Sequence, residues 1–253
     1  MAEKKLEGAG LRGQVAGKTS LSTVGKAGKG LTYRGYEIEV LAEKAFFEEV
    51  AYMLLYGNLP NKEEYSSYTN KLKKLRALPN ELKEVLENIP ASAHPMDVMR
   101  TGCSMLGNLE PEGDFKNQNS SADRILASLA SIIVYWYKFS HEGKKVNLET
   151  DYETIGGHFL SLLTDKDPSE DDIRCLDTSL ILYAEHGFNA STFTARTCAS
   201  TLSDIHSCIT GAIGTLRGPL HGGANEAAME MIEQYSSREE AHKAVLELSL
   251  IHI

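Results

Sequence analysis

The chain has 253 residues, of which 42% are hydrophobic and 24% charged, as in an ordinary globular protein. It is long enough for one large domain, or for one domain and part of a second. With 26 basic and 35 acidic residues the net charge is −9, which argues against a general nucleic-acid binder. A small basic pocket for an anionic metabolite remains compatible with this charge. The absence of long polar tracts excludes a mainly disordered chain.

The cysteines and the apolar segments predict reduced thiols and no membrane span. The 4 cysteines, Cys103, Cys175, Cys198 and Cys208, form no C-x-x-C motif and are too sparse for a disulfide framework. Free thiols predict a cytoplasmic location. The N-terminal residues contain no apolar signal-peptide core. The most apolar stretch, 125–137, is shorter than the roughly 20 residues that span a bilayer, so we expect a buried core helix and no membrane segment.

The predicted fold class is mainly α, with a small N-terminal β segment. Residues 11–38 are rich in Gly, Thr and Val and predict short strands and turns, with one turn at 26–30. Apolar residues at helical spacing follow from Val40 to Gly57. Further helices are expected at 61–76, 80–88, 96–106, 125–139, about 152–163, from Asp167 through Tyr183, 191–206, 208–216, 224–235 and after Ser237, with a loop at 110–121. No βαβ rhythm is present, which argues against a Rossmann-like fold.

One segment combines a histidine with features of a helix N-terminus. His221 stands between a proline turn and two glycines, in the string GPLHGGANE, just before a helical pattern. Glycines let a backbone approach a ligand closely, and the dipole at a helix start favours a neutral imidazole. A neutral imidazole can donate a hydrogen bond to a developing enolate oxygen. The alternative is a histidine in a turn without any catalytic role.

A second polar cluster lies where one predicted helix ends and the next begins, in the string YAEHGFNAST, residues 183–192. Such a junction can bind a carboxylate or merely cap two helices, and capping is the simpler interpretation. Arg196 lies two helical turns after Asn189, on the next predicted helix, and could face an anion. Arg34, between two tyrosines, suits anion contact or a structural corner, and His94 suits a helix entry.

Other kinds of site are disfavoured. His206 and Cys208 are two residues apart, which places them on different faces of a helix, and no second pair exists to complete a metal site. We therefore expect no bound metal. The sequence also lacks the G-x-S-x-G motif of hydrolases and the P-loop motif.

Four segments, in order, resemble the citrate synthase family: LTYRGYEIEVLAE, HPMDVMRTG, YAEHGFNASTFTAR and GPLHGGANEA. LTYRGYEIEVLAE and HPMDVMRTG, together with SIIVYWY and IGGHFL, are more similar to the 2-methylcitrate synthase branch than to ordinary citrate synthase. The resemblance covers residues 11–247.

The resemblance implies a citrate-synthase-like, multi-helical homodimer that condenses an acyl-CoA with oxaloacetate and then hydrolyses the thioester. In the 2-methylcitrate branch, propionyl-CoA, oxaloacetate and water give 2-methylcitrate and CoA in propionate catabolism. No cofactor is implied, because the CoA thioester is a substrate. The alternatives are a citrate synthase that uses acetyl-CoA in the tricarboxylic acid cycle, or a non-catalytic helical module.

The resemblance also assigns residues. His221 matches the histidine that hydrogen-bonds the thioester carbonyl and stabilises the enol. His186 matches the oxaloacetate-binding histidine, and Asn189 is a second contact. Lys62 stands where the branch often has an arginine that contacts substrate; it keeps the charge but loses the bidentate geometry.

The implied domain organisation is incomplete at the C-terminus. We expect a β or irregular segment at 1–38, part of a large helical domain at 39–218 and the start of a small domain at 219–247. The last six residues, LSLIHI at 248–253, match one reading frame of a sequencing adapter, and we expect them to be a scar.

The family's second catalytic histidine, in a G-x-G-H-P-x-Y segment, its aspartate base and its substrate-binding arginines have no counterpart in these residues. A general base contributes about 10²–10⁴-fold to such a reaction. We therefore expect the 253-residue chain by itself to be inactive and poorly soluble. The measurement is CoA release from an acyl-CoA and oxaloacetate, and saturable release by the purified chain would contradict the expectation.

Overall fold

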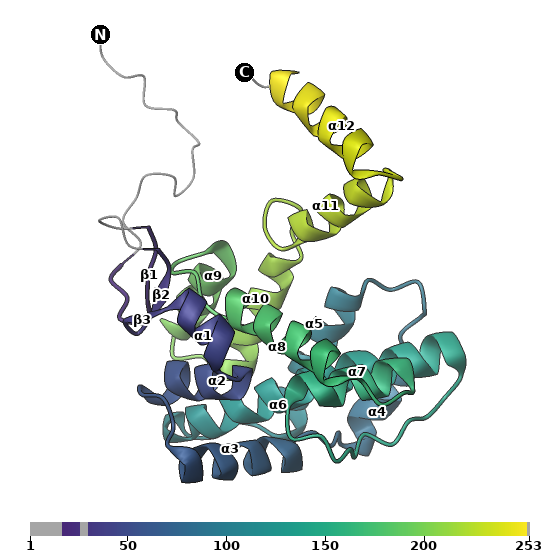
Figure 1. Ribbon diagram of the computed structural model, residues 1–253. Coiled ribbons are helices and arrows are strands. Elements are labelled where there is room, and N and C mark those ends of the chain that lie inside the picture. The colour runs from purple at the N-terminus through teal and green to yellow at the C-terminus, as the bar shows by residue number, and fades with distance from the viewer. Residues whose placement is uncertain (1–16, 26–29, 252–253) are drawn as a thin grey trace.

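The computed structural model describes residues 17–25 and 30–251, with side chains described as far as Glu247. The elements in chain order are β1 (Ser22–Thr23), β2 (Thr32–Tyr33), β3 (Tyr36–Glu37), α1 (Ile38–Lys44), α2 (Phe47–Tyr56), α3 (Lys62–Lys74), α4 (Asn80–Glu87), α5 (Pro95–Leu109), the 3₁₀ helix η1 (Phe115–Asn117), α6 (Gln118–Glu142), α7 (Ile155–Thr164), α8 (Glu170–Tyr183), α9 (Ala190–Ala199), α10 (Ile205–Leu216), α11 (Gly223–Glu233) and α12 (Arg238–Ile251). The mainly helical prediction is confirmed. Figure 1 shows the helices α1 to α10 gathered into one body, from which α11 and α12 project.

The N-terminal strands form a small antiparallel sheet in the order β1-β2-β3. The turn between β2 and β3 consists of Arg34 and Gly35, with φ of 46° and 91°, as a two-residue hairpin of type I′ requires. The Arg34 guanidinium donates to the carbonyl oxygen of Leu54, 3.1 Å away. In this structure Arg34 is therefore the structural corner rather than an anion contact. The predicted turn at 26–30 lies largely outside the described residues.

The predicted helix over residues 40–57 is in fact two helices. The chain is extended at Ala45 and Phe46, with ψ of 160° and 155°. The carboxylate of Glu49 accepts from the Phe46 amide at 2.7 Å and so caps the start of α2. Apolar spacing continues across this break because both helices bury residues in the same core, which is why the pattern suggests one helix.

Several helix boundaries follow from side-chain caps, and two predicted boundaries were wrong. The helix expected from residue 61 is α3, and Asn61 is its N-cap, with Oδ1 accepting from the Glu63 and Glu64 amides. The N-cap of α8 is Ser169, whose Oγ accepts from the Asp172 amide, and not Asp167. The predicted helix at 191–206 ends at Ala199, since Asp204 caps a separate α10.

The predicted loop at 110–121 is also shorter than expected. Asp114 accepts from the Lys116 amide at 2.9 Å and starts η1, and α6 follows directly at Gln118. At the other end of the chain, Ser237 Oγ accepts from the Glu240 amide at 3.2 Å, as predicted for a cap, and the α12 backbone continues past Glu247 to Ile251. The division into domains at residues 38 and 218 stays a prediction.

The long helix α6 is the centre of the hydrophobic core, as the apolar stretch 125–137 predicts. Its residues Ile132 and Trp136 are 0% and 2% exposed. They pack with a cluster from α4, α5 and the segment before α7, which includes Leu78, Leu82, Leu86, Val98, Leu106, Tyr135 and Leu148. Each fully buried large aliphatic side chain stabilises a fold by about 1.5–3 kcal/mol, so this cluster fixes the large helical body.

The core also contains a buried glutamate. Glu48 of α2 is 0% exposed, and its Oε1 accepts from the Ile155 amide at the start of α7, 2.7 Å away. Burial raises the pKa of Glu48 to about 7, with the charge of Asp177 adding to the rise and the Ile155 amide opposing it. Glu48 therefore holds a proton in the folded state at pH values where it is ionised in the unfolded chain.

We expect Glu48→Gln to remove a pH dependence of stability. The folded-state pKa of about 7 lies above the ordinary value of 4.5, so the native protein loses stability as pH rises between these values. The slope is at most about 1.4 kcal/mol per pH unit. Urea unfolding at pH 5 and pH 8 measures this. We expect the unfolding free energy of the variant, relative to that of the native chain, to be higher at pH 8 than at pH 5. The exposed Glu43→Gln is the matched control, and an equal difference at both pH values would contradict the expectation.

Candidate active site

His221 lies in the turn between α10 and α11, and two bonds connect it to the start of α9. Its Nε2 lies 2.9 Å from Ser191 Oγ and 3.3 Å from the Ser191 amide nitrogen. A backbone N–H only donates, so Nε2 accepts and the proton of the neutral imidazole is on Nδ1. The imidazole is half-buried, and its Nδ1–H is the ring atom available for a ligand.

The glycines after His221 have a different purpose from the one that the sequence suggests. A Cβ on Gly222 would lie 2.6 Å from the Leu216 carbonyl oxygen, and one on Gly223 would lie 2.8 Å from that of Arg217. The glycines therefore let the chain fold back on the end of α10. Their close approach is to the protein's own backbone, not to a ligand.

The segment 183–192 caps a helix, as its simpler interpretation predicts, and also contacts His221. Asn189 is the N-cap of α9, with Oδ1 accepting from the Thr192 amide at 2.9 Å. Ser191 Oγ, which has a single proton to donate, lies 2.8 Å from the same Oδ1 and 2.9 Å from His221 Nε2. Asn189, Ser191 and His221 are thus connected by hydrogen bonds. The side-chain amide of Asn225 donates to Tyr183 Oη at 3.4 Å and so connects α11 to the end of α8.

His186 lies at the junction of α8 and α9, three residues before Asn189, and its imidazole is exposed. It makes no hydrogen bond with residues 17–25 or 30–247. Its side chain is therefore available to a ligand on the same junction that holds Ser191 against His221. Arg196 stacks on the ring of Phe188 at 4.8 Å and so covers the same junction.

Lys62 is the first residue of α3 and is exposed. Figure 1 places α3 at the opposite end of the body from α11, so the structure does not bring Lys62 together with His186, Asn189 and His221.

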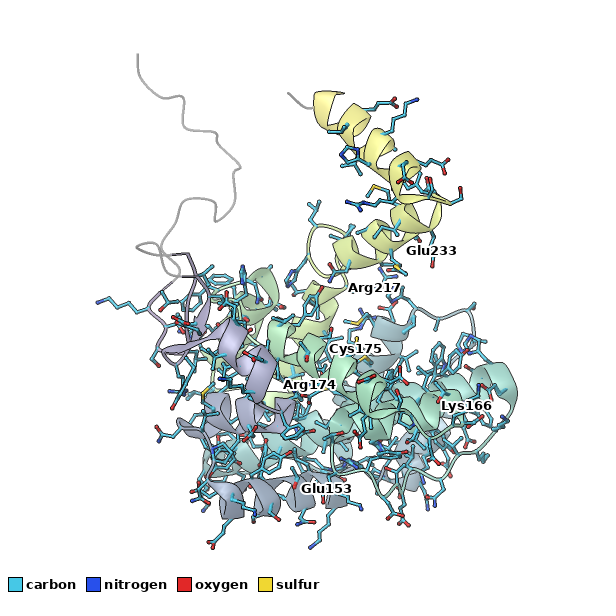
Figure 2. The ribbon with its side chains drawn as sticks, in the orientation of Figure 1. Glu153, Lys166, Arg174, Cys175, Arg217 and Glu233 are labelled. Carbon is cyan, nitrogen blue, oxygen red and sulfur yellow. The ribbon has the colours of Figure 1, made fainter. Side chains whose placement is uncertain are left out.

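The first turn of α5 supports the His221 turn from the other side. His94 is the N-cap of α5, as predicted for a helix-entry histidine: its Nδ1 accepts from the Met96 amide, and its Nε2 donates to Glu226 of α11 at 3.1 Å. Asp97 accepts from Arg217 Nε at 3.0 Å. Figure 2 shows Arg217 where the chain leaves α10 for α11.

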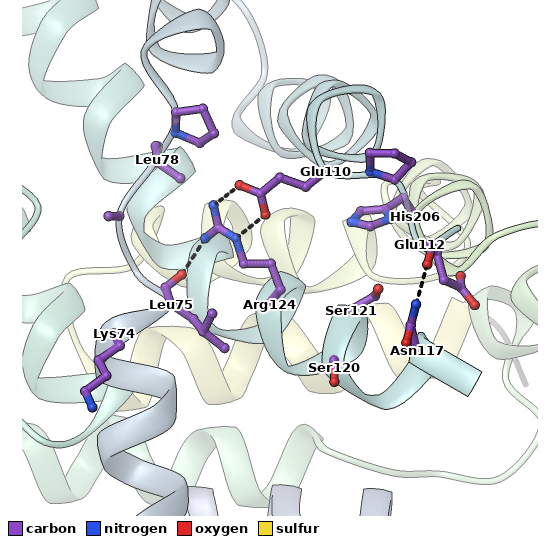
Figure 3. A pocket seen from close by; sticks show the side chains of 13 residues that line it. Lys74, Leu75, Leu78, Glu110, Glu112, Asn117, Ser120, Ser121, Arg124 and His206 are labelled. Carbon is purple, nitrogen blue, oxygen red and sulfur yellow. Dashed lines mark hydrogen bonds and ion pairs between the residues drawn. The ribbon is translucent and has the colours of Figure 1, made fainter. Parts of the chain in front are cut away.

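A cavity of about 610 Å³ lies elsewhere, between the α3–α4 loop and the start of α6. Figure 3 shows the paired Glu110 and Arg124 on one side of it and His206 on the other. Burial lowers the pKa of His206. His206 is near the start of α10 and His221 is beyond its end, a separation of roughly 18 Å along the helix. This cavity is therefore not part of the His221 site.

Neither a metal site nor a membrane span is found in the described residues. No group of three or more His, Cys, Asp or Glu side chains is placed there to hold a metal ion. Within the same residues, no helix combines the length and the hydropathy needed to cross a bilayer.

The chain belongs to the citrate synthase family. The family described as "Citrate synthase, C-terminal domain" matches residues 10–249. The chain is 64% identical to the 2-methylcitrate synthase of Shewanella oneidensis over 96% of its own length and 65% of that protein. It therefore spans slightly less than two thirds of this relative.

Two solved structures share the fold. The crystal structure of citrate synthase from Thermotoga maritima matches with a TM-score of 0.81 and 34% identity, over 94% of this chain and 63% of that one. A ternary complex of carboxymethyl coenzyme A and oxaloacetate with citrate synthase from Thermoplasma acidophilum matches with a TM-score of 0.81 and 27% identity, over 89% and 60%.

Sequence reasoning did not single out Ser191 or Asp97 as site residues. Ser191 is 30 residues from His221 and Asp97 is 120 from Arg217, so only the packing of the helices reveals these contacts. The one local signal was the polar start of α9, where Asn189 and Ser191 stand two residues apart.

We expect Gly223→Ala to displace the His221 turn. Its Cβ would lie 2.8 Å from the Arg217 oxygen and 3.0 Å from that of Gly218, and backbone atoms cannot move aside. A loss of about 1–3 kcal/mol in unfolding free energy follows from such overpacking. The measurements are thermal unfolding and the imidazole NMR signals of His221. The control is Gly211→Ala, within α10. Its Cβ would meet only Thr194 Cγ2 of α9, at 3.4 Å, and helix propensity favours alanine. Equal stability of both variants would contradict the expectation.

Proposed function

We propose that this chain is part of an acyltransferase that condenses propionyl-CoA with oxaloacetate and water to give 2-methylcitrate and CoA. The observation that carries the proposal is the pair of bonds from Ser191 to His221 Nε2, at 2.9 and 3.3 Å. These bonds leave a neutral imidazole with its proton on Nδ1. The 64% identity to a 2-methylcitrate synthase supports the choice of reaction.

His221 is the proposed catalytic residue. Removal of a proton from the acyl α-carbon leaves negative charge on the thioester oxygen, and a fixed Nδ1–H can donate to that oxygen as charge develops. Ser191 prevents the ring from turning and keeps the donor aimed. Because the imidazole is neutral, it stabilises the enol without bringing a full charge into the site.

His186 and Asn189 are the proposed oxaloacetate contacts. The imidazole of His186 is exposed, and it stands on the same junction as Ser191. Asn189 Oδ1 is already committed to the start of α9, so Asn189 would contact substrate through its Nδ2 donors. Lys62 stays a prediction, and its position on α3 gives it no part in this constellation.

The acyl preference separates this proposal from the alternative, a citrate synthase that uses acetyl-CoA. One methylene in an apolar pocket is worth roughly 1–3 kcal/mol, so the two substrates differ by about 10–200-fold at most. The solved relatives at 34% and 27% identity are named citrate synthases. The relative at 64% identity is named 2-methylcitrate synthase, which supports propionyl-CoA as the substrate proposed for this chain.

Two further properties belong to the proposal. A homodimer is implied by the family resemblance. A cytoplasmic location agrees with the four cysteines of the chain, all of which are free thiols in the structure.

The test is an extended protein in which residues 1–247 are followed by the C-terminal part of the Shewanella relative that this chain does not span. We expect saturable CoA release with oxaloacetate, with kcat/KM higher for propionyl-CoA than for acetyl-CoA. His221→Ala should reduce kcat by about 10²–10³-fold, the usual effect of losing such a donor. His242→Ala, at an exposed histidine of α12, is the matched control. A strong acetyl-CoA preference would overturn the choice of substrate, and full activity of His221→Ala would overturn the mechanism.

A further inference from the structure

We propose that the N-terminal sheet is part of the substrate site, and that Tyr33 and Ser22 are positioning residues that hold the His186 turn. The inference rests on the proposed role of His186 and adds the groups that fix its backbone. Figure 1 shows the β strands beside the end of α8 and the start of α9, where this turn lies.

Tyr33 reaches from β2 to the end of α8. Tyr33 is 0% exposed, and its hydroxyl donates to the Ile181 carbonyl oxygen at 3.0 Å. The Leu182 oxygen is a second acceptor at 3.3 Å, and the Glu185 amide donates to Tyr33 Oη at 3.2 Å. The last carbonyls of a helix lack their usual intrahelical donors. The Ile181 oxygen also accepts from the Ala184 amide at 3.2 Å, so the Tyr33 hydroxyl adds a bond at the end of α8 and binds an amide of the turn as well.

The Glu185 carboxylate holds the other side of the turn. Its Oε1 accepts from Ser22 Oγ of β1 at 2.9 Å and from the Gly187 amide at 2.6 Å. Gly187 has φ of 74°, a left-handed conformation that glycine adopts without strain. The carboxylate therefore ties the sharpest bend of the turn to the sheet.

His186 stands between these two fixed amides. The Glu185 amide is bonded to Tyr33 and the Gly187 amide to the Glu185 carboxylate, while the imidazole of His186 is exposed. A backbone held on both sides with its side chain in solvent is preorganised for a ligand, because little freedom remains to be lost on binding. Tyr33 and Ser22 do not contact the substrate in this proposal; they act through the turn.

A merely structural role for Tyr33 is separable by experiment. The ring packs in a cluster with Ile38, Leu41, Val50 and Ile181, so its removal would damage the core. Tyr33→Phe keeps the ring and removes only the hydroxyl. Ser22→Ala removes the second contact, at a half-buried position in β1. The matched controls are Tyr36→Phe and Ser20→Ala, two exposed positions of the same segment.

The first measurement is amide hydrogen exchange on the full 253-residue chain. We expect Tyr33→Phe to increase the exchange rate of the Glu185 amide by about tenfold, the effect of one lost hydrogen bond, with core amides of α6 unchanged. Ser22→Ala should do the same at Gly187. Unchanged exchange at both amides, or an equal increase throughout the chain, would overturn the proposal.

The second measurement uses the extended protein and separates the KM for oxaloacetate from kcat. Both variants should raise this KM by about threefold to tenfold and change kcat by less than about twofold, because the turn binds substrate and His221 acts on the acyl group. An unchanged KM, or a loss confined to kcat, would overturn the role in substrate positioning. If the unmodified extended protein releases no CoA, the proposed function fails, and the exchange experiment still decides whether the sheet holds the turn.

Discussion

The close packing of α5 against α6 and α10 determines where every other part of the site can lie. A Cβ on Gly102 would approach Ile132 of α6 to 2.5 Å, and one on Gly107 would approach His206 of α10 to 2.6 Å. These two glycines let α5 lie against both helices at once. Since α10 leads directly into the His221 turn, the α5–α10 contact places this turn beside the first turn of α5, where Asp97 accepts from Arg217.

The site itself is built from two turns that follow buried helices. One turn follows α8 and carries His186, and the other follows α10 and carries His221. Ser191 joins them, because its amide and hydroxyl both face His221 Nε2. Polar groups at such helix ends lack partners within the helix, so they are available for substrate, for caps or for each other. In this chain Asn189 caps α9, Ser191 connects the two turns through His221, and His186 is exposed to solvent.

The elements that could be predicted from the sequence are those whose cause lies within a few residues. The start of α3 near residue 61 was predicted, and Asn61 and Glu64 cap it. The apolar stretch on α6 is buried as expected. The break at Phe46 was missed because α1 and α2 bury the same face. The glycines after His221 were correctly placed at a close approach, but the neighbour is Leu216 and not a ligand. The local sequence pattern predicts that a small residue is required here. Only the packed structure shows which atom leaves no room for a side chain.

The long-range bonds of the site could not be predicted for a related reason. Tyr33 and Glu185 are 152 residues apart, and nothing in either segment alone indicates the other. The motif containing Tyr33 suggested a corner, which Arg34 does form through Leu54. Tyr33, the buried neighbour of that corner, is the residue that reaches the His186 turn. A family resemblance identifies the histidines, since these define the chemistry, and leaves their supports unassigned.

The two turns differ in how firmly they are held. The His186 turn is fixed by the buried hydroxyl of Tyr33 and by a carboxylate bonded within the fold. The His221 turn is held by the Ser191 contacts to His221 Nε2 and by the pairs Arg217–Asp97 and His94–Glu226. The four side chains of the two pairs are at least 25% exposed. Exposed pairs of this kind are worth about 1 kcal/mol or less each. A displacement of α11 therefore costs much less than a displacement of the His186 turn.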